Sequence, residues 1–138
     1  MRTSIRGLLV ALFVLAGFGC GTLKYEVPGT ARAPGADAKV IAEVNKGAGS
    51  TKLEIRAENL PPPERLQPGT TAFVVWQRKN DTAPWQRIGA LTYDKGKRRG
   101  TLEGTCPETK FELVITAELN TSPASPSGNI MFQQLVGK

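Results

Sequence analysis

The sequence contains no histidine and only two cysteines among its 138 residues. Histidine is the usual general base near neutral pH, a common metal ligand and a member of most nucleophile triads. Its absence removes the usual apparatus of proton-transfer, zinc-dependent and triad-based enzymes. No glycine-rich phosphate-binding motif follows a strand-like segment, and Asp and Glu do not occur at calcium-loop spacing. We therefore predict a protein that is not an enzyme and has no cofactor, metal site or small-molecule substrate.

Long apolar runs are also scarce, and the one that is present is short. It extends from Gly7 to Phe18, follows Arg2 and Arg6, and has no acidic residue nearby. A helix needs roughly 20 apolar residues to cross the hydrocarbon core of a bilayer, so a permanent span is the weaker interpretation. A basic first region followed by a short apolar run and small residues is typical of a cleaved export signal. We predict that residues 1–19 are a signal peptide.

A cysteine, Cys20, directly follows the small residues at the end of this leader, Gly17 and Gly19 among them. This arrangement resembles the lipobox of bacterial lipoproteins, whose cysteine is joined to diacylglycerol and becomes the first mature residue. The family prefers Leu and then Ala or Ser where Gly17 and Phe18 stand here. The resemblance implies a lipid anchor on Cys20. Because Gly21 rather than aspartate follows, it also implies sorting to an outer membrane, facing the periplasm. The alternative is an ordinary secretory signal and a secreted or soluble periplasmic protein.

The second cysteine, Cys106, depends on the first for a partner. If Cys20 carries a lipid, Cys106 has no intramolecular partner in an oxidising compartment. Its neighbours Thr105 and Pro107 supply neither the base nor the cation that activates a thiol. We expect a small, partly buried residue near a turn, with an intermolecular disulfide as the alternative. Without lipidation, a bond between Cys20 and Cys106 becomes available.

The chain after the leader is long enough for one domain and too short for two. Residues 21–37 are rich in Gly, Ala, Pro and Thr and show neither helical nor alternating periodicity. Such a composition buries too little apolar surface to become ordered. We predict that residues 20–37 comprise the lipidated cysteine and a flexible tether, and that residues 38–138 form the folded domain.

Alternation of apolar and polar residues dominates this remaining part. The period of two is clearest at 52–58 and 111–118, while 71–77 is apolar on both faces, as in a central strand. Shorter predicted strands lie at 39–45, 86–93, 100–104 and 129–135. Residues that favour turns separate them. The pattern predicts an all-β fold, an antiparallel β-sandwich of immunoglobulin-like shape with about seven strands.

A proline-rich stretch, LPPPERLQPG at 60–69, interrupts the strands. Prolines donate no backbone hydrogen bonds and favour polyproline II geometry. We therefore predict a stiff connection between the two sheets. A ligand for an aromatic-lined groove is the alternative.

Five segments of the sequence occur in a characteristic order. They are NLPPP, FVVW at 73–76, IGAL at 88–91, FELVITAE at 111–118 and SPASPSGNIMF at 122–132. Together they resemble the extracytoplasmic C-terminal domain of the anti-sigma-K factor family, with Phe73 where that family usually has tyrosine. The resemblance implies a β-sandwich and an extracytoplasmic location. The family's regulatory activity does not carry over, because its sigma-binding cytoplasmic domain and transmembrane helix are not recognisable here.

Two tryptophans and a basic run are the remaining features. Trp76, in the apolar strand, is expected to pack between the sheets. The predicted partner contacts are Trp85, Arg87, Lys97, Arg98 and Arg99. An exposed tryptophan beside cations would suit a protein or a glycan, whereas the alternative for the run KGKRRG is a solvated hairpin turn. We do not expect a nucleic-acid partner.

Two hypotheses of function follow. The first is a lipid-anchored, extracytoplasmic binding or structural module of the bacterial cell envelope. Its membrane contact would be the lipid anchor and its partner an envelope protein or polymer. The second is a sensor or regulatory lobe that acts with a separate membrane anti-sigma system, and it follows from the family resemblance alone.

Overall fold

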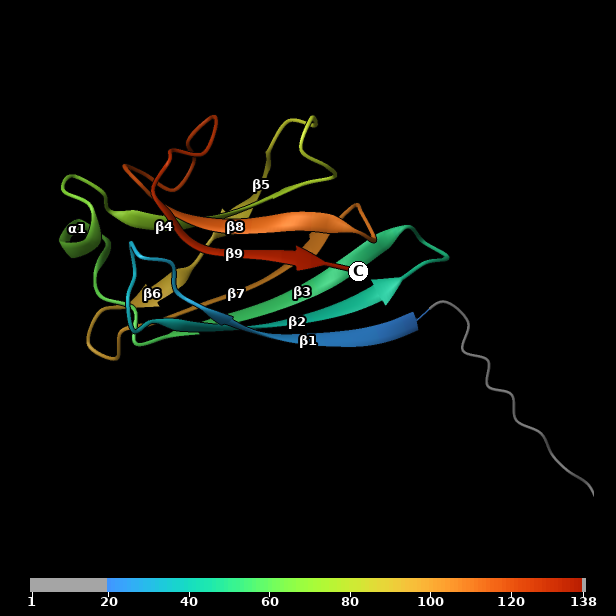
Figure 1. Cartoon of the computed structure of the whole chain (residues 1–138), viewed down its shortest axis with the longest axis horizontal. Coiled ribbons are helices and arrows are strands. Elements are labelled where there is room, and N and C mark those ends of the chain that lie inside the picture. The colour runs from blue at the N-terminus through green and yellow to red at the C-terminus, as the bar shows by residue number, and fades with distance from the viewer. Residues whose placement is uncertain (1–19, 138) are drawn as a thin grey trace, which may run out of the picture.

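The computed structural model describes residues 20–137, so the predicted signal peptide lies outside the described residues. The described residues form nine β-strands and one short helix. The strands make two antiparallel sheets that face each other (Figure 1). The predicted all-β, two-sheet architecture is confirmed, with two more strands than the seven expected.

The larger sheet, called sheet A below, has the strand order β1-β2-β3-β7-β6. Its strands are β1 (Cys20–Pro28), β2 (Asp37–Asn45), β3 (Ser50–Glu58), β6 (Thr92–Asp94) and β7 (Arg99–Cys106). Buried and exposed residues alternate along β2 and β3. One face of sheet A therefore packs against the interior, and its outer face is solvated.

The smaller sheet, sheet B, has the order β5-β4-β8-β9. Its strands are β4 (Ala72–Arg78), β5 (Gln86–Ala90), β8 (Phe111–Glu118) and β9 (Ile130–Val136). The two central strands, β4 and β8, are buried on both faces. This confirms the central strand expected from the apolar stretch 71–77, because such a strand must be covered on both sides.

The main core lies between the sheets. It includes Leu53 and Ile55 from β3 and Phe73 and Val75 from β4, none more than 1% exposed. The ring of Phe73 meets Tyr93 of β6 edge to face, with 5.3 Å between ring centroids. Each large side chain removed from water contributes about 1.5–3 kcal/mol, so this packing is the main force that holds the sheets together.

The flexible tether predicted for residues 20–37 is wrong. Residues 20–28 are strand β1, which pairs antiparallel with β2 along its whole length. The loop that follows is also ordered: the backbone N–H of Gly29 donates a 2.7 Å hydrogen bond to the carbonyl oxygen of Ala36. The folded domain therefore includes β1 and does not begin at residue 38.

The composition of this segment hid its strand. Leu23, Tyr25 and Val27 alternate with polar residues and pack against the main core, and Val27 is 4% exposed. Three apolar residues are few for an isolated strand, but β2 supplies a backbone ladder and the core a surface to cover. The small residues that resembled a spacer instead fit a tight loop, in which Ala33 and Ala36 are buried.

The proline-rich segment connects the two sheets, as predicted. It leaves sheet A after Glu58 and enters sheet B at Ala72. Pro62 keeps polyproline-like dihedrals, and one helical turn not expected from the sequence, α1 (Pro63–Leu66), follows it. A proline suits the first helical position, where the absent N–H has no intrahelical partner.

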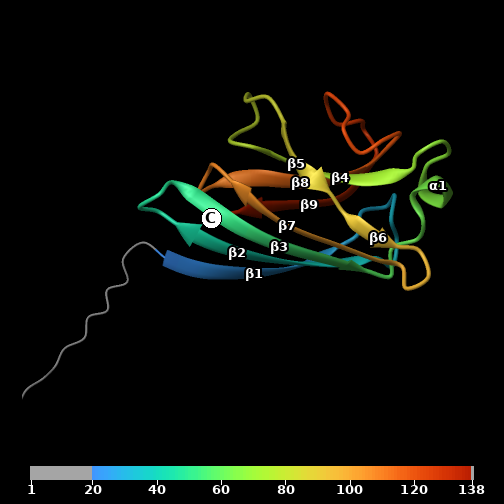
Figure 2. The same cartoon turned by 180° about the vertical axis from the view of Figure 1, so that it is seen from behind.

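The sandwich has two ends, which Figures 1 and 2 show from opposite sides. The Cys20 end carries the start of β1 and the loops 46–49, 79–85 and 107–110. The α1 end carries α1 and the loops 29–36, 95–98 and 119–129. Because β1 spans nine residues at about 3.3 Å each, the two ends are roughly 30 Å apart.

Candidate functional site

Cys20, the residue predicted to carry a lipid, is the first residue of β1 and pairs with Asn45 of β2. No flexible spacer separates it from the folded domain. A lipid at this position would bring the Cys20 end directly to the bilayer surface, and the α1 end would point away from it.

The five predicted partner contacts do not form one surface. Trp85 ends the loop before β5 of sheet B and Arg87 lies in β5, near the Cys20 end. Lys97 and Arg98 lie in the β6–β7 turn of sheet A and Arg99 begins β7, at the α1 end (Figures 1 and 2). The sequence places them within 15 residues of one another, but the chain crosses from one sheet to the other between β5 and β6. That crossing separates the two groups.

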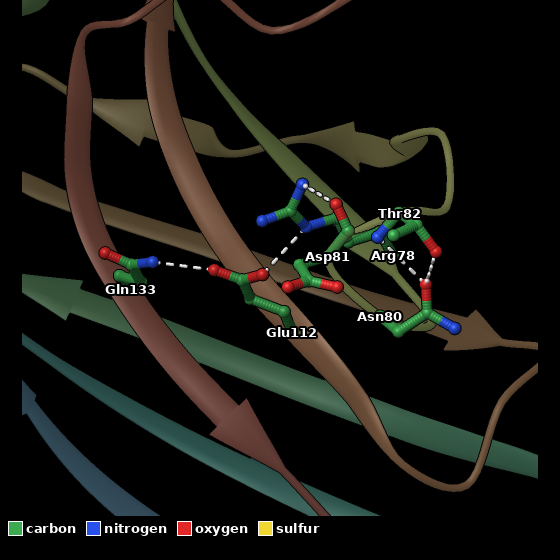
Figure 3. Close-up of polar contacts among 6 residues, drawn as sticks. All are labelled: Arg78, Asn80, Asp81, Thr82, Glu112 and Gln133. Carbon is green, nitrogen blue, oxygen red and sulfur yellow. Dashed lines mark hydrogen bonds and ion pairs between the residues drawn. The ribbon is translucent and has the colours of Figure 1, made fainter.

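Trp85 belongs to a cluster on the outer face of sheet B. The guanidinium of Arg78 lies 4.3 Å from the centroid of the Trp85 ring, a cation–π contact. Nε of Arg78 donates a 2.8 Å hydrogen bond to Glu112 Oε1, and Gln133 Nε2 donates one of 2.6 Å to Glu112 Oε2 (Figure 3). Sequence reasoning missed Arg78 and Glu112, which only the pairing of β4 with β8 places side by side.

The loop beside this cluster is folded by its own polar groups. Asn80 Oδ1 accepts hydrogen bonds from the backbone N–H and the hydroxyl of Thr82 (Figure 3). Arg78 is already ion-paired with Glu112 and stacked on Trp85. The charged and polar groups of the cluster therefore bind one another. They position the β4–β5 loop and leave no charge available to a ligand.

Trp76 does not pack between the sheets, contrary to the prediction. It is 1% exposed but lies on the outer face of sheet B, in a second apolar cluster with Val74 and Val114. Phe73 and Val75 take the inward positions of β4. Because β4 is apolar on both faces, its sequence does not indicate which residues point between the sheets, so it could not assign Trp76 to a side.

A chain of buried polar groups adjoins Trp76. Its Nε1 donates a 2.9 Å hydrogen bond to Thr116 Oγ1, and Thr116 Oγ1 donates one of 2.5 Å to Glu118 Oε2. The same carboxylate oxygen accepts a 2.8 Å bond from the backbone N–H of Ser127. Glu118 is 6% exposed, and its bond to Ser127 fastens the β8–β9 loop to sheet B. This network is an element of structure.

Cys106 is fully buried at the end of β7, not partly buried as expected. Burial raises the pKa of its thiol to about 11. The thiol is therefore protonated near neutral pH, which makes it a poor nucleophile. Within the described part of the chain Cys106 is a free cysteine.

The α1 end gathers exposed cations from three segments of the chain. We call them the basic end cluster: Arg32 of the β1–β2 loop, Arg65 of α1, and Lys95, Lys97 and Arg98 of the β6–β7 turn. Lys95 Nζ forms a 3.0 Å ion pair with Glu64 of α1, which joins two of the segments. Nη1 of Arg32 lies 3.5 Å from Gln67 Oε1, which joins the third.

Arg99, the last of the predicted contacts, is not available in the same way. Its Nε donates a 3.1 Å hydrogen bond to Glu58 Oε1, and Arg56 binds the other oxygen of that carboxylate. The hydrogen bond from Arg99 is the main cause that lowers the pKa of Glu58. Arg99 therefore contributes to the sheet A surface rather than to the basic end cluster.

The described residues show few features of a metal site, a membrane-spanning helix or an enclosed pocket. Residues 20–137 contain no group of three or more Cys, Asp or Glu side chains that could hold a metal ion. Over the same range, no helix is long and apolar enough to cross a bilayer. A shallow, open hollow of about 380 Å³ lies on the outer face of sheet A, and its lining includes Glu43, Lys52, Glu54 and Glu103.

No protein-family model matches the sequence, and no curated protein or solved structure matches it either. Its function must therefore be inferred from its own residues.

Proposed function

We propose that this protein is a non-catalytic binding module, anchored by a lipid on Cys20 to a bacterial outer membrane and facing the periplasm. It presents the α1 end to an envelope protein or polymer. The observation that carries the proposal is the position of Cys20 at one end of β1, which runs the length of the sandwich. The loops of the α1 end are thereby displayed about 30 Å from the anchor.

The absence of catalysis is supported by the chemistry of the side chains. The sequence has no histidine. The Cys106 thiol is buried with a raised pKa. Glu118, the buried carboxylate, is bound by Thr116 and Ser127. None of these groups is both accessible and poised to transfer a proton or to attack a substrate.

We further propose that the sandwich is immunoglobulin-like. The orders β2-β3-β7-β6 and β5-β4-β8-β9 correspond to the A-B-E-D and C′-C-F-G orders of that fold, with β1 as an additional edge strand. In this correspondence the connections β3–β4 and β8–β9, both at the α1 end, are the B–C and F–G loops. Those loops carry the binding surface of immunoglobulin variable domains, which supports the α1 end as the contact surface.

The anchor is tested by the intact mass of the protein purified from native membranes, beside the variants Cys20→Ser and Cys106→Ser. We expect a mature chain that begins at Cys20 and carries added acyl mass. Cys20→Ser should lose that mass, and Cys106→Ser, the matched control, should keep it. An unmodified, soluble wild-type chain would contradict the anchor and leave a secreted sandwich.

A second candidate function is a sensor lobe that works with a separate membrane anti-sigma system. It is supported by the order of the segments of the family resemblance, which fall on the α1 connection, β4, β5, β8 and β9 in turn. Deletion of the gene should then change transcription that depends on one sigma factor. Unaltered sigma-dependent transcription would exclude this candidate.

A further inference from the structure

We propose that the basic end cluster binds a linear polyanion that carries phosphate groups along its length. The inference rests on the proposed function in one respect: an anchor at Cys20 directs this end toward the envelope polymers rather than toward the anchoring bilayer. The binding chemistry itself depends only on residues of the α1 end.

The cations of this end are available to a ligand. Lys95 is paired with Glu64, but Arg32, Arg65, Lys97 and Arg98 are exposed and make no ion pair with any described residue. The nearby acid Asp94 accepts a 3.0 Å hydrogen bond from the backbone N–H of Lys97 and so shapes the turn. Guanidinium groups bind phosphate oxygens in pairs, and Lys supplies a point charge.

The cluster is also held in place. The backbone N–H of Leu60 donates a 2.9 Å hydrogen bond to the carbonyl oxygen of Arg98, and the hydroxyl of Tyr93 donates one to the carbonyl oxygen of Leu60. Together with the Lys95–Glu64 ion pair, these bonds fix the β6–β7 turn against the proline-rich connection. A fixed array of charges loses less conformational entropy on binding than one on a mobile loop.

The backbone of Arg98 gives an independent indication. Its φ of 53° lies in the left-handed region, which side chains with a Cβ adopt at a cost in stability. Glycine would relieve that strain, yet an exposed arginine occupies the position. Strained backbone of this kind is found preferentially where a side chain has a function.

The surroundings favour a polymer of charges over ligands that stack. Tyr93 is committed to Phe73 through its ring and to Leu60 through its hydroxyl, so it cannot serve as a platform for bases or sugars. The exposed cations come from three separate segments of this end. A chain of repeated phosphates can contact cations on several segments at once, which a single small anion cannot.

The test measures binding of long-chain inorganic polyphosphate to the lipid-free mature chain with Cys20→Ser, at 50 and 200 mM salt. One triple variant carries Arg32→Gln, Lys97→Gln and Arg98→Gln. The matched control carries Lys46→Gln, Lys79→Gln and Lys110→Gln, three exposed lysines of the Cys20 end. Both triples lower the net charge equally, so they separate a local site from general attraction.

We expect the α1-end triple to weaken binding at least tenfold at 50 mM salt. It should also reduce the slope of log affinity against log salt concentration by about one unit for each phosphate that is no longer bound. The control triple should change affinity by less than threefold. Equal losses of affinity in both triples would overturn the proposal, because net charge alone would then explain binding. Tighter binding of the same residues to vesicles of phosphatidylglycerol would also overturn it and make a lipid surface the ligand.

A variant of Leu119 separates binding of polyphosphate from binding of an acidic protein. Leu119 is 68% exposed at this end and would serve as an apolar anchor in a protein interface. Leu119→Ser should leave polyphosphate binding unchanged, and a large loss would overturn the proposal. The polyphosphate measurement uses a chain without the lipid anchor, so a missing acyl chain in the mass experiment and a missing polyphosphate affinity are separate failures.

Discussion

The hydroxyl oxygen of Tyr25 accepts a 3.0 Å hydrogen bond from the backbone N–H of Gly137, so the first strand of the described chain is fastened to its last residues. Thr30 adds a second tie, since its backbone N–H donates a 2.9 Å bond to the carbonyl oxygen of Met131. These bonds, together with the pairing of β1 and β2, make the segment after Cys20 part of the domain.

A chain that begins at Gly29 should therefore be much less stable than one that begins at Cys20. It loses the burial of Leu23, Tyr25 and Val27, and each such side chain contributes about 1.5–3 kcal/mol when fully buried. We expect a loss of about 3 kcal/mol or more in urea unfolding. Tyr25→Phe, which removes only the hydroxyl, should cost about 1 kcal/mol. Equal stability of the shortened and longer chains would restore the tether interpretation.

Thr116→Val should destabilise the protein by about 1–3 kcal/mol. Valine keeps the shape of the side chain but has no hydroxyl. The buried indole N–H of Trp76 then loses its acceptor, and Glu118 loses the hydrogen bond from residue 116. Thermal unfolding measures the loss, and tryptophan fluorescence, to which both Trp76 and Trp85 contribute, should change with the altered environment of Trp76. Thr101→Val, on the exposed face of β7, is the control and should stay within about 0.5 kcal/mol. A neutral effect at Thr116 would show that the network contributes no stability.

Gln77→Met should stabilise the protein by about 1 kcal/mol. Gln77 is 2% exposed, and its Oε1 has no hydrogen-bond partner among residues 20–137, while its Nε2 donates a 2.7 Å bond to Gln86. Methionine removes the unsatisfied oxygen at nearly constant shape. Gln86→Ala should have the opposite sign, because it deprives the buried Nε2 of its acceptor. Destabilisation by Gln77→Met in chemical unfolding would contradict this account.

Arg98→Gly should raise stability by about 1 kcal/mol, because glycine adopts the left-handed backbone of this position without a Cβ clash. Arg98→Ala keeps the Cβ and should give no such gain, so the pair isolates the backbone effect from loss of charge. If the basic end cluster binds polyphosphate, both variants should weaken that binding similarly. A loss of stability in Arg98→Gly would show that the side chain has a structural role.

Stability should fall at alkaline pH through Cys106. The pKa of its thiol is about 11 in the folded protein and 9.0 in the reference state, so the folded state holds the proton more tightly. The stabilisation is complete below pH 9 and is lost as the pH rises through 11. At about 1.4 kcal/mol per pKa unit, the loss reaches roughly 3 kcal/mol. Urea unfolding of Cys106→Ala from pH 8 to 11 should show a shallower decline, and parallel curves would contradict the assignment.

The sequence predicted those elements whose residues carry their own signal. Alternation of apolar and charged residues identified β3 and β8, and an unbroken apolar stretch identified β4 as central. Prolines, which cannot donate to a ladder, located the connection between the sheets. These properties are local, so they can be recognised before the partner strand is known.

The tertiary structure decided where neighbours in the sequence end up. β1 has few apolar residues and becomes a strand because β2 pairs with it and the core covers it. Trp76 faces outward because the packing on each side of sheet B decides which residues of β4 point into the core. Trp85 and Lys97 are separated because the chain changes sheets between them. Arg32, Arg65 and Arg98 are far apart in sequence but lie at the same end, because the three connections that carry them are all at that end. Pairing and packing are contacts between distant segments, and only the folded chain contains them.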